Sequence, residues 1–231
     1  MTGNLYCIGV GPGDPELMTL KAARLIRSCP VLALPAADPA NSVAYQIAAR
    51  AVPEAAEKEL LGLDLPMSAD PSLLAQRHRH AAGVLADRLQ QGKDVAFLTL
   101  GDPTLYCTFS YLQPYLAGMG ITAQVVSGVP SFCAAAARLG VPLALGDESL
   151  HVVPAAYTDS LPGWPGTRVL MKSGRKLSRI KAQLKEHPGV ALAVENCGLP
   201  GERVWRNADE IPEDAGYLTL LLLLPDRETE R

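Results

Sequence analysis

Residues 5–15, LYCIGVGPGDP, decide the fold, because an apolar segment leads directly into a turn with three glycines. The apolar part is typical of a buried strand. Glycines at positions 9, 11 and 13 would let backbone N–H groups approach a ligand closely. A plain strand-to-helix turn that uses glycine for its positive φ explains the same residues equally well.

This turn does not match the common phosphate-binding loops. A dinucleotide fingerprint needs Gly-x-Gly-x-x-Gly opening a helix, but position 14 is Asp, and Pro12 and Pro15 interrupt the helix start. No Gly-Lys-Ser/Thr follows the turn, so a Walker A loop is absent. Because Asp14 would repel a pyrophosphate, the turn favours a ligand without phosphates and disfavours a nicotinamide dehydrogenase.

Strand and helix patterns alternate along the rest of the chain. The expected strands are 31–34, 94–100, 121–126, 151–153, 169–171, 190–194 and 218–224. The expected helices are 19–28, 42–50, 70–91, 108–117, 131–139 and 176–186, with Ser42, Asp70 and Ser131 as caps. Residues 60–65 fit either type. This order predicts an α/β protein with a mostly parallel sheet in its first half and a mixed sheet in its second half.

The segment Gly118-Met119-Gly120 is the best candidate for a domain boundary. A chain of 231 residues allows one large domain or two small ones. We therefore expect an N-terminal α/β domain of residues 1–117 and a C-terminal α/β domain of residues 121–231.

The composition excludes several classes of protein. With 48% hydrophobic and 19% charged residues, the chain has enough apolar material for a core. Aromatic residues make up 5% and the net charge is −3, so a base-stacking or strongly basic nucleic-acid surface is not expected. The five cysteines are far apart and form no CxxC, which argues against disulfides and a protein-bound metal. No signal peptide or membrane span is apparent, so we expect a cytoplasmic protein without a membrane partner.

Two more turns follow apolar strand segments. In residues 98–106, LTLGDPTLY, a buried strand delivers Gly101, Asp102 and Pro103. Ligands bind beyond the carboxyl ends of strands in an open α/β sheet, which makes Asp102 a candidate binding residue. A solvated turn Asp that bonds its own backbone explains it as well. The third turn is 127–131, SGVPS, where helix capping by Ser131 is the simpler explanation.

Together the three turns resemble the tetrapyrrole (corrin/porphyrin) methylases, which use S-adenosyl-L-methionine as methyl donor. Residues 9–22, GVGPGDPELMTLKA, resemble the opening signature of this family, and Gly101-Asp102-Pro103 resembles its second signature. The turn 127–131 is similar to its domain-junction turn. The resemblance implies two α/β domains with the cofactor in the cleft between them, and a homodimer.

The flanking residues resemble one subgroup, the precorrin-2 C20-methyltransferases of cobalamin biosynthesis. The similar segments are 101–112, 135–144 and 216–221. The subgroup usually has Gly-Ser where this chain has Cys107 and Thr108, a departure that concerns the pocket wall. The resemblance implies methylation at C20 of precorrin-2 or of cobalt-factor II, and the sequence does not choose between the two. Methyl transfer from a sulfonium needs no covalent enzyme intermediate, so no catalytic nucleophile is expected.

The resemblance also implies site residues. The cofactor contacts that it implies are Pro12, Leu100, Gly101, Asp102, Leu105, Ser131, Phe132 and Met171, with residues 195–198 nearby. Asp102 is a candidate contributor to catalysis, because a carboxylate complements the sulfonium charge. Tyr106 is a second candidate, since it could contact the macrocycle; packing in the cleft wall explains Tyr106 as well.

The substrate is rich in carboxylates, whereas the protein is net acidic, so basic residues must gather locally. Lys172 and Arg175 are the candidates for substrate binding, since they follow a predicted strand end; Arg138 and the segment 77–80 are further candidates. For 77–80 a solvated helix face is the preferred interpretation. Three alternatives stay open: a methylase acting at another corrin or uroporphyrinogen III carbon, a non-catalytic tetrapyrrole carrier, and the disfavoured dehydrogenase. A branch of the family that modifies ribosomal RNA is disfavoured by charge and aromatic content.

Overall fold

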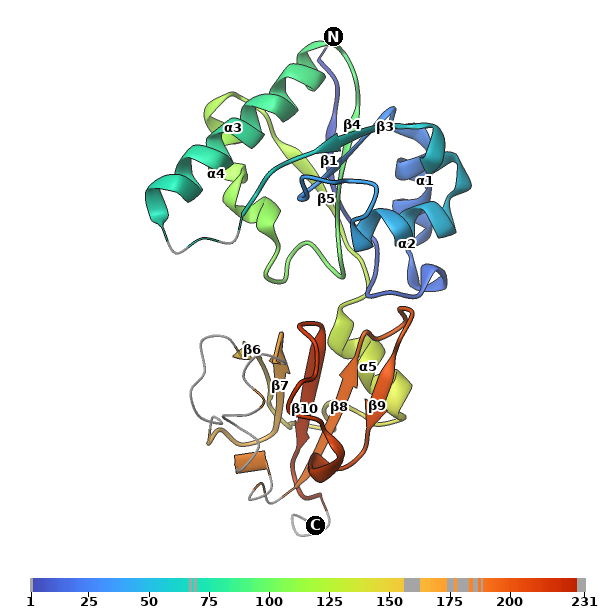
Figure 1. Cartoon of the computed structure of the whole chain (residues 1–231), viewed down its shortest axis with the longest axis vertical. Helices are drawn as coiled ribbons and strands as arrows, with labels where there is room; N and C mark the ends of the chain where they lie inside the picture. The colour runs from blue at the N-terminus through green and yellow to red at the C-terminus, as the bar shows by residue number, and fades with distance from the viewer. Residues whose placement is uncertain are drawn as a thin grey trace. The chain divides into compact units, whose positions relative to one another are not determined.

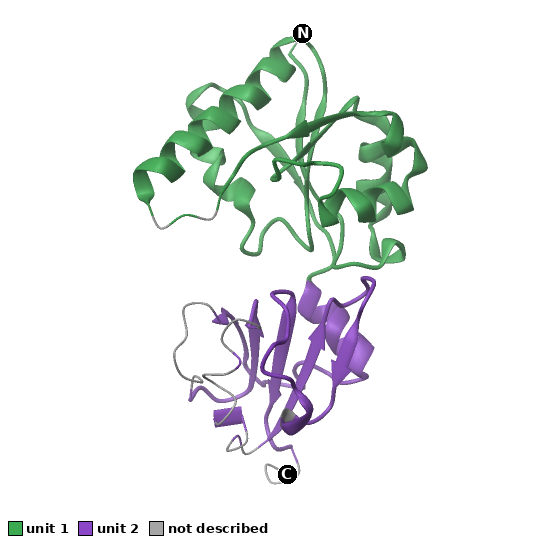
Figure 2. Cartoon of the chain, viewed as in Figure 1, with its two compact units in different colours: residues 1–130 green, residues 131–231 purple. Residues whose placement is uncertain are grey.

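The computed structural model describes residues 2–66, 68, 70–155, 163–173, 177, 183, 184, 187 and 189–227. The chain forms two compact units, residues 1–130 and 131–231 (Figure 2). Each unit is built on its own sheet, and we describe each by itself.

In its described residues, unit 1 contains a five-stranded sheet in the order β3-β2-β4-β1-β5. The strands are β1 (Leu5–Gly9), β2 (Val31–Leu34), β3 (Glu59–Gly62), β4 (Val95–Thr99) and β5 (Ala123–Val126). All neighbouring pairs are parallel, with Gly9 opposite Thr99 and Ile8 opposite Val126. The expected parallel sheet is therefore confirmed, and all five strands end at one edge.

Helices cover both faces of this sheet (Figure 1). They are α1 (Leu20–Ser28), α2 (Val43–Ala51), α3 (Pro71–Gln90) and α4 (Gln113–Gly118), with short 3₁₀ helices η1 (Pro15–Leu17), η2 (Pro53–Glu57) and η3 (Thr108–Tyr111). Alternate residues of β1 and β4, such as Cys7 and Phe97, pack with Leu85 and Leu89 of α3 in one buried cluster. This alternation follows from the two-residue period of a strand.

Local signals explain most helix boundaries. The Ser42 hydroxyl accepts the Tyr45 N–H at 3.2 Å, and Asp70 Oδ1 accepts the Ser72 N–H at 2.8 Å, so two of the three predicted caps are confirmed. The third, Ser131, is instead the first residue of the helix α5 (Ser131–Leu139). The segment 108–117, expected to be helical apart from Pro114, forms two separate helices. η3 ends at Tyr111 and α4 begins at Gln113, because Pro114 fits the first turn of a helix but not its interior.

In its described residues, unit 2 contains a mixed five-stranded sheet in the order β6-β7-β10-β8-β9, as the sequence predicts. Its elements are β6 (Leu150–Pro154), β7 (Thr167–Met171), β8 (Val190–Glu195), β9 (Arg203–Trp205), β10 (Thr219–Leu224), α5 (Ser131–Leu139) and η6 (Ala208–Glu210). β6 and β7 are parallel, whereas β10 is antiparallel to both β7 and β8. Most of the helix expected over 176–186 lies outside the described residues.

The division between the units lies after Pro130, not at 118–120. β5 pairs along β1, so residues 121–130 lie in unit 1. Gly120 has φ 74° and directly follows Met119, the C-cap of α4, which is the position where glycine commonly ends a helix. The glycines at 118 and 120 therefore mark a helix end within unit 1.

Candidate functional site

The three predicted turns meet at the carboxyl edge of the first sheet. They follow β1, β4 and β5, which lie side by side in the order β4-β1-β5. The Gly11 N–H donates to the Gly101 carbonyl at 3.3 Å, and the Gly101 N–H donates back to the Gly11 carbonyl at 2.8 Å. Gly11 and Gly101 have φ values of 83° and 72°, which glycine adopts without strain.

The backbones of these turns are too close together for side chains. A Cβ on Gly9 would lie 2.5 Å from the Gly101 carbonyl oxygen and 2.8 Å from the Gly128 nitrogen. A Cβ on Gly128 would lie 2.9 Å from the Gly9 carbonyl and closer still to that of Gly101. Glycines 9, 101 and 128, one from each turn, therefore let the main chains of the three turns pack directly against one another, and we call this arrangement the glycine cradle.

Asp102 joins two of the turns. Its Oδ1 accepts hydrogen bonds from the Thr104 N–H, at 2.8 Å, and from the Thr104 hydroxyl. Its Oδ2 accepts the Gly128 N–H at 3.0 Å, from the turn after β5. Burial raises the pKa of Asp102, but hydrogen bonds donated by Thr104, Gly128 and Ser127 outweigh this and hold the pKa below its usual value.

This geometry gives Asp102 a structural role that the sequence did not reveal. The residue is only 8% exposed, and both carboxylate oxygens already accept protein donors. The solvated turn Asp considered above would bond only its own backbone, whereas Asp102 also holds a residue 26 positions away. Asp102 thus carries a buried negative charge that fixes the relative positions of the second and third turns.

The other predicted residues of unit 1 surround the cradle. Pro12 is buried in the first turn, and Leu100 is half-buried directly before Gly101. Leu105 is half-buried, and its N–H donates to the Asp102 carbonyl at 3.3 Å. Tyr106 is 47% exposed and has φ 50°, a left-handed conformation that is rare for a bulky side chain. Such strained residues cluster at binding and catalytic sites.

Cys107 follows Tyr106 and belongs to the departure from the subgroup pattern. Its thiol lies 3.4 Å from the Thr99 hydroxyl and is hydrogen-bonded to the thiol of Cys7 in β1. These bonds, together with backbone N–H groups of η3, lower the pKa of Cys107 despite its burial. Where the subgroup usually has glycine, this chain therefore has a buried thiol directly after Tyr106 and its strained backbone.

In unit 2, as in unit 1, residues with unusual backbone conformations follow the carboxyl ends of neighbouring strands. β7 and β8 both run antiparallel to β10, so their carboxyl ends lie at the edge where β10 begins. Lys172 directly follows β7 and Asn196 directly follows β8, with φ values of 58° and 51°. The Asn196 N–H donates to the Leu218 carbonyl at 3.2 Å, and the Ser173 N–H donates to that of Thr219 at 3.0 Å. Two residues with unusual backbone conformations therefore flank the start of β10.

Lys172 and Tyr217 meet at this edge. The Lys172 ammonium lies 6.0 Å from the centroid of the Tyr217 ring, which is within cation–π range. Glu195, 4% exposed, holds the segment before Tyr217: its Oε1 accepts the Gly216 N–H and its Oε2 accepts Arg203 Nε, both at 2.6 Å. Sequence analysis included Tyr217 only within the segment 216–221 and gave it no role, because no motif marks an aromatic residue two positions before a strand.

The remaining site residues that the sequence predicts belong to unit 2. Phe132 is buried in α5, while Ser131 and Met171 are half-buried. Arg175 lies outside the described residues. Arg138 Nε pairs with Glu202 Oε1 at 2.5 Å, so its charge is used within unit 2.

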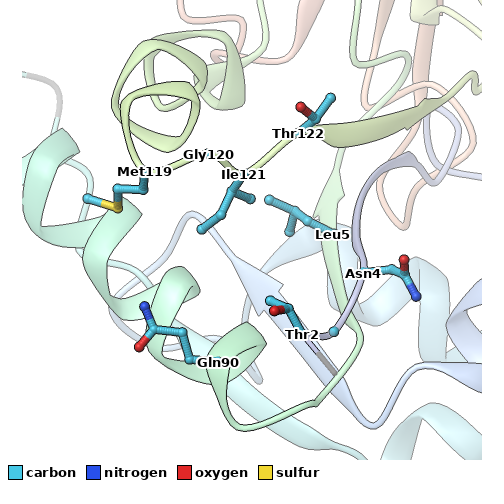
Figure 3. Close-up of a pocket in the computed structure, with 9 residues that line it drawn as sticks. Thr2, Asn4, Leu5, Gln90, Met119, Gly120, Ile121 and Thr122 are labelled. Atoms are coloured by element: carbon cyan, nitrogen blue, oxygen red, sulfur yellow. The ribbon is translucent and has the colours of Figure 1, made fainter.

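Other kinds of site have less support in the described part of the chain. Its His, Cys, Asp and Glu residues form no group of three that could hold a metal ion. None of its helices has the length and apolar character needed to cross a membrane. A cavity of about 360 Å³ lies at the opposite edge of the first sheet, lined by residues 2–5, Gln90 and residues 119–122 (Figure 3). No lining residue is charged, so this cavity does not match the carboxylate-rich ligand expected above.

Comparison with known proteins shows which family this chain resembles. The profile of the family described as Tetrapyrrole (Corrin/Porphyrin) Methylases matches residues 4–211. A cobalt-precorrin-2 C(20)-methyltransferase of Salmonella typhimurium is 35% identical over 237 aligned positions, covering 100% of this chain and 99% of that protein. A probable cobalt-precorrin-2 C(20)-methyltransferase of Methanocaldococcus jannaschii is 36% identical over 186 positions, covering 77% of this chain and 76% of that protein.

Solved structures show the same fold. A uroporphyrin-III C-methyltransferase from Thermus thermophilus superposes with a TM-score of 0.68 at 26% identity, covering 99% of this chain and 100% of that chain. A cobalt precorrin-4 methyltransferase superposes with a TM-score of 0.72 at 21% identity, covering 95% and 93%. Since the family profile spans most of the sequence and a relative aligns with it from end to end, the chain belongs to the tetrapyrrole (corrin/porphyrin) methylase family.

Proposed function

We propose that this protein is an S-adenosylmethionine-dependent methyltransferase that methylates C20 of precorrin-2, or of its cobalt complex, in cobalamin biosynthesis. The observation that carries the proposal is the end-to-end match to the Salmonella typhimurium cobalt-precorrin-2 C(20)-methyltransferase. The structure supports it, because the family's signature turns meet in the glycine cradle, where their main chains are too close together for side chains.

The residues around the cradle fit the cofactor. S-adenosylmethionine supplies an electrophilic methyl group on a sulfonium, so the protein must mainly orient the reactants and exclude water. The Asp102 carboxylate, which accepts the Gly128 N–H, keeps a negative charge at this edge that complements the sulfonium of the cofactor. The resemblance assigns further cofactor contacts to Pro12, Leu100 and Leu105 in unit 1, and to Ser131, Phe132 and Met171 in unit 2.

Substrate recognition is proposed for residues at the carboxyl ends of strands in each unit. Lys172 offers a cation at the edge of the second sheet, held near the ring of Tyr217. Tyr106 offers an exposed ring next to the cofactor turn of unit 1. We assign carboxylate binding to Lys172 and Arg175, and contact with the macrocycle to Tyr106 and Tyr217.

Replacing Tyr106 by glycine tests this assignment. Relief of the left-handed strain, about 1–3 kcal/mol, exceeds the entropic cost of a new glycine, about 0.5–1 kcal/mol. We expect the free energy of unfolding in urea to stay equal or rise by about 1 kcal/mol, while kcat/KM falls about tenfold. If the fall in kcat/KM were accompanied by a clear fall in the free energy of unfolding, the ring would only support the fold.

The decisive experiment is anaerobic incubation with ¹³C-methyl S-adenosylmethionine and either precorrin-2 or cobalt-factor II. We expect one new methyl group, located at C20 by mass spectrometry and carbon-13 NMR. The better substrate decides between the metal-free and cobalt forms. A methyl group at another carbon would keep the family and reject the C20 assignment. Cofactor binding without transfer would favour a carrier or a different substrate.

The oligomeric state and the cellular location of the protein are proposed together with the function. The resemblance implies a homodimer, for which sedimentation should give twice the chain mass of 24.5 kDa. A cytoplasmic location is proposed because the substrate and the methyl donor are small intracellular metabolites. Fractionation of the native host checks the location.

A further inference from the structure

The basic segment Arg77-His78-Arg79-His80 lies in the first half of α3. This helix connects the carboxyl end of β3 to the amino end of β4, and both strands are parallel to β2. In such a crossover the start of the helix lies at the carboxyl edge of the sheet. The first half of α3 therefore lies toward the edge that carries the three turns.

One residue of this segment contacts the loop that follows the second turn. His78 stacks on Tyr111 at the end of η3, with ring centroids 5.4 Å apart and planes within 6°. Tyr111 remains 63% exposed, although its ring contacts the imidazole. The stack thus joins α3 to the loop of Asp102 and Tyr106 and leaves a flat aromatic surface open to solvent.

The two arginines of the segment differ in their surroundings. Arg77 Nη1 lies 2.9 Å from Asp64 Oδ2, so its charge is compensated. The Arg79 guanidinium lies 5.9 Å from the centroid of the Tyr115 ring in α4. Within the described residues no carboxylate pairs with the exposed Arg79, and its charge is available to an anion. Figure 1 shows α3 and α4 side by side. The consecutive residues His78 and Arg79 of α3 thus contact the rings of Tyr111 and Tyr115, which lie four positions apart in the chain.

We propose that His78, Arg79 and Tyr111 form a subsite for a carboxylate-bearing side chain of the tetrapyrrole, an inference that rests on the proposed function. Arg79 donates its guanidinium N–H groups to the carboxylate, whose geometry they match. The exposed Tyr111 ring packs against the edge of the pyrrole that carries this side chain. His78 holds Tyr111 in place. The subsite therefore replaces the solvated helix face that the sequence alone favoured for this segment.

Equilibrium titration with cobalt-factor II in the absence of methyl donor tests the subsite. We expect Arg79→Gln to weaken tetrapyrrole binding about tenfold, the loss typical of a charge-assisted hydrogen bond that is partly exposed. Tyr111→Ser should weaken binding by about the same factor, because the packing of the ring against the pyrrole is lost. The dissociation constant of S-adenosylhomocysteine should stay within about twofold of the unchanged protein. His80→Gln is the matched control, because His80 is exposed on the same helix and, within the described residues, no ring contact joins it to Tyr111 or Tyr115.

Three results would overturn the proposal. Unchanged tetrapyrrole binding in both variants, with the wild-type chain still active, would reject the subsite and leave the function intact. An equal loss of S-adenosylhomocysteine binding would mean that the stack only supports the cofactor loop. A wild-type chain that binds S-adenosylhomocysteine but neither cobalt-factor II nor precorrin-2 would reject the proposed substrate, and the subsite with it.

Discussion

Replacing Gly128 by alanine is expected to weaken S-adenosylhomocysteine binding at least a hundredfold and to destabilise the protein. The new Cβ would meet the carbonyls of Gly9 and Gly101, both main-chain groups at the ends of central strands. A flexible side chain could move away, but these strand ends are held by the parallel ladder. The second and third turns must separate, at a cost of about 1–3 kcal/mol. Calorimetry and urea unfolding measure the two effects.

Gly83 provides the matched control for this substitution. It lies inside α3, and a Cβ there would have no atom within 4 Å. Gly83→Ala should leave ligand binding unchanged and stabilise the helix by about 0.5–1 kcal/mol, because alanine has the higher helix propensity. If Gly128→Ala bound the ligand normally, the close approach of the turns would have no role in binding.

The contrast between these two glycines shows what the sequence alone could predict. Local rules located the strands before the three turns and the caps at Ser42 and Asp70, since apolar segments and capping residues act over a few positions. They could not tell Gly128 from Gly83, because the atoms that exclude a side chain come from strands more than 25 residues away. The boundary at 118–120 was misplaced for the same reason, since the pairing of β5 with β1 leaves no local signal.

Long-range charge pairing limited the prediction of the site. Arg138 is a plausible carboxylate ligand by composition, yet it pairs with Glu202, 64 positions along the chain. Lys172 and Tyr217 lie far apart in sequence and meet only because β10 pairs with β7. The resemblance supplied candidate positions, whereas the partners of each residue became clear only from the sheet order.

Asp102→Asn should lower the free energy of unfolding by about 1–3 kcal/mol at pH 7. Oδ2 of Asp102 accepts the Gly128 N–H, and Oδ1 accepts the Thr104 N–H. An asparagine has one acceptor oxygen, so whichever way its amide turns, one backbone N–H faces an NH₂ group. Leaving a buried donor unpaired costs about 1–3 kcal/mol. Asp70→Asn is the control, because asparagine caps a helix as well as aspartate does.

The pH dependence of the unfolding free energy shows whether Asp102 stabilises the fold by its charge or by its shape. The pKa of Asp102 is lower in the folded protein than in the unfolded chain, where it is about 3.9. Its ionised form therefore stabilises the fold above that value, and the contribution is lost as the pH falls through the folded pKa. The difference in unfolding free energy between wild type and Asp102→Asn should be full at pH 7 and shrink in acid, as measured by urea unfolding from pH 7 to pH 3. A difference that stayed constant over this range would mean that Asp102 acts by its shape, and the buried charge would then have no part in joining the turns.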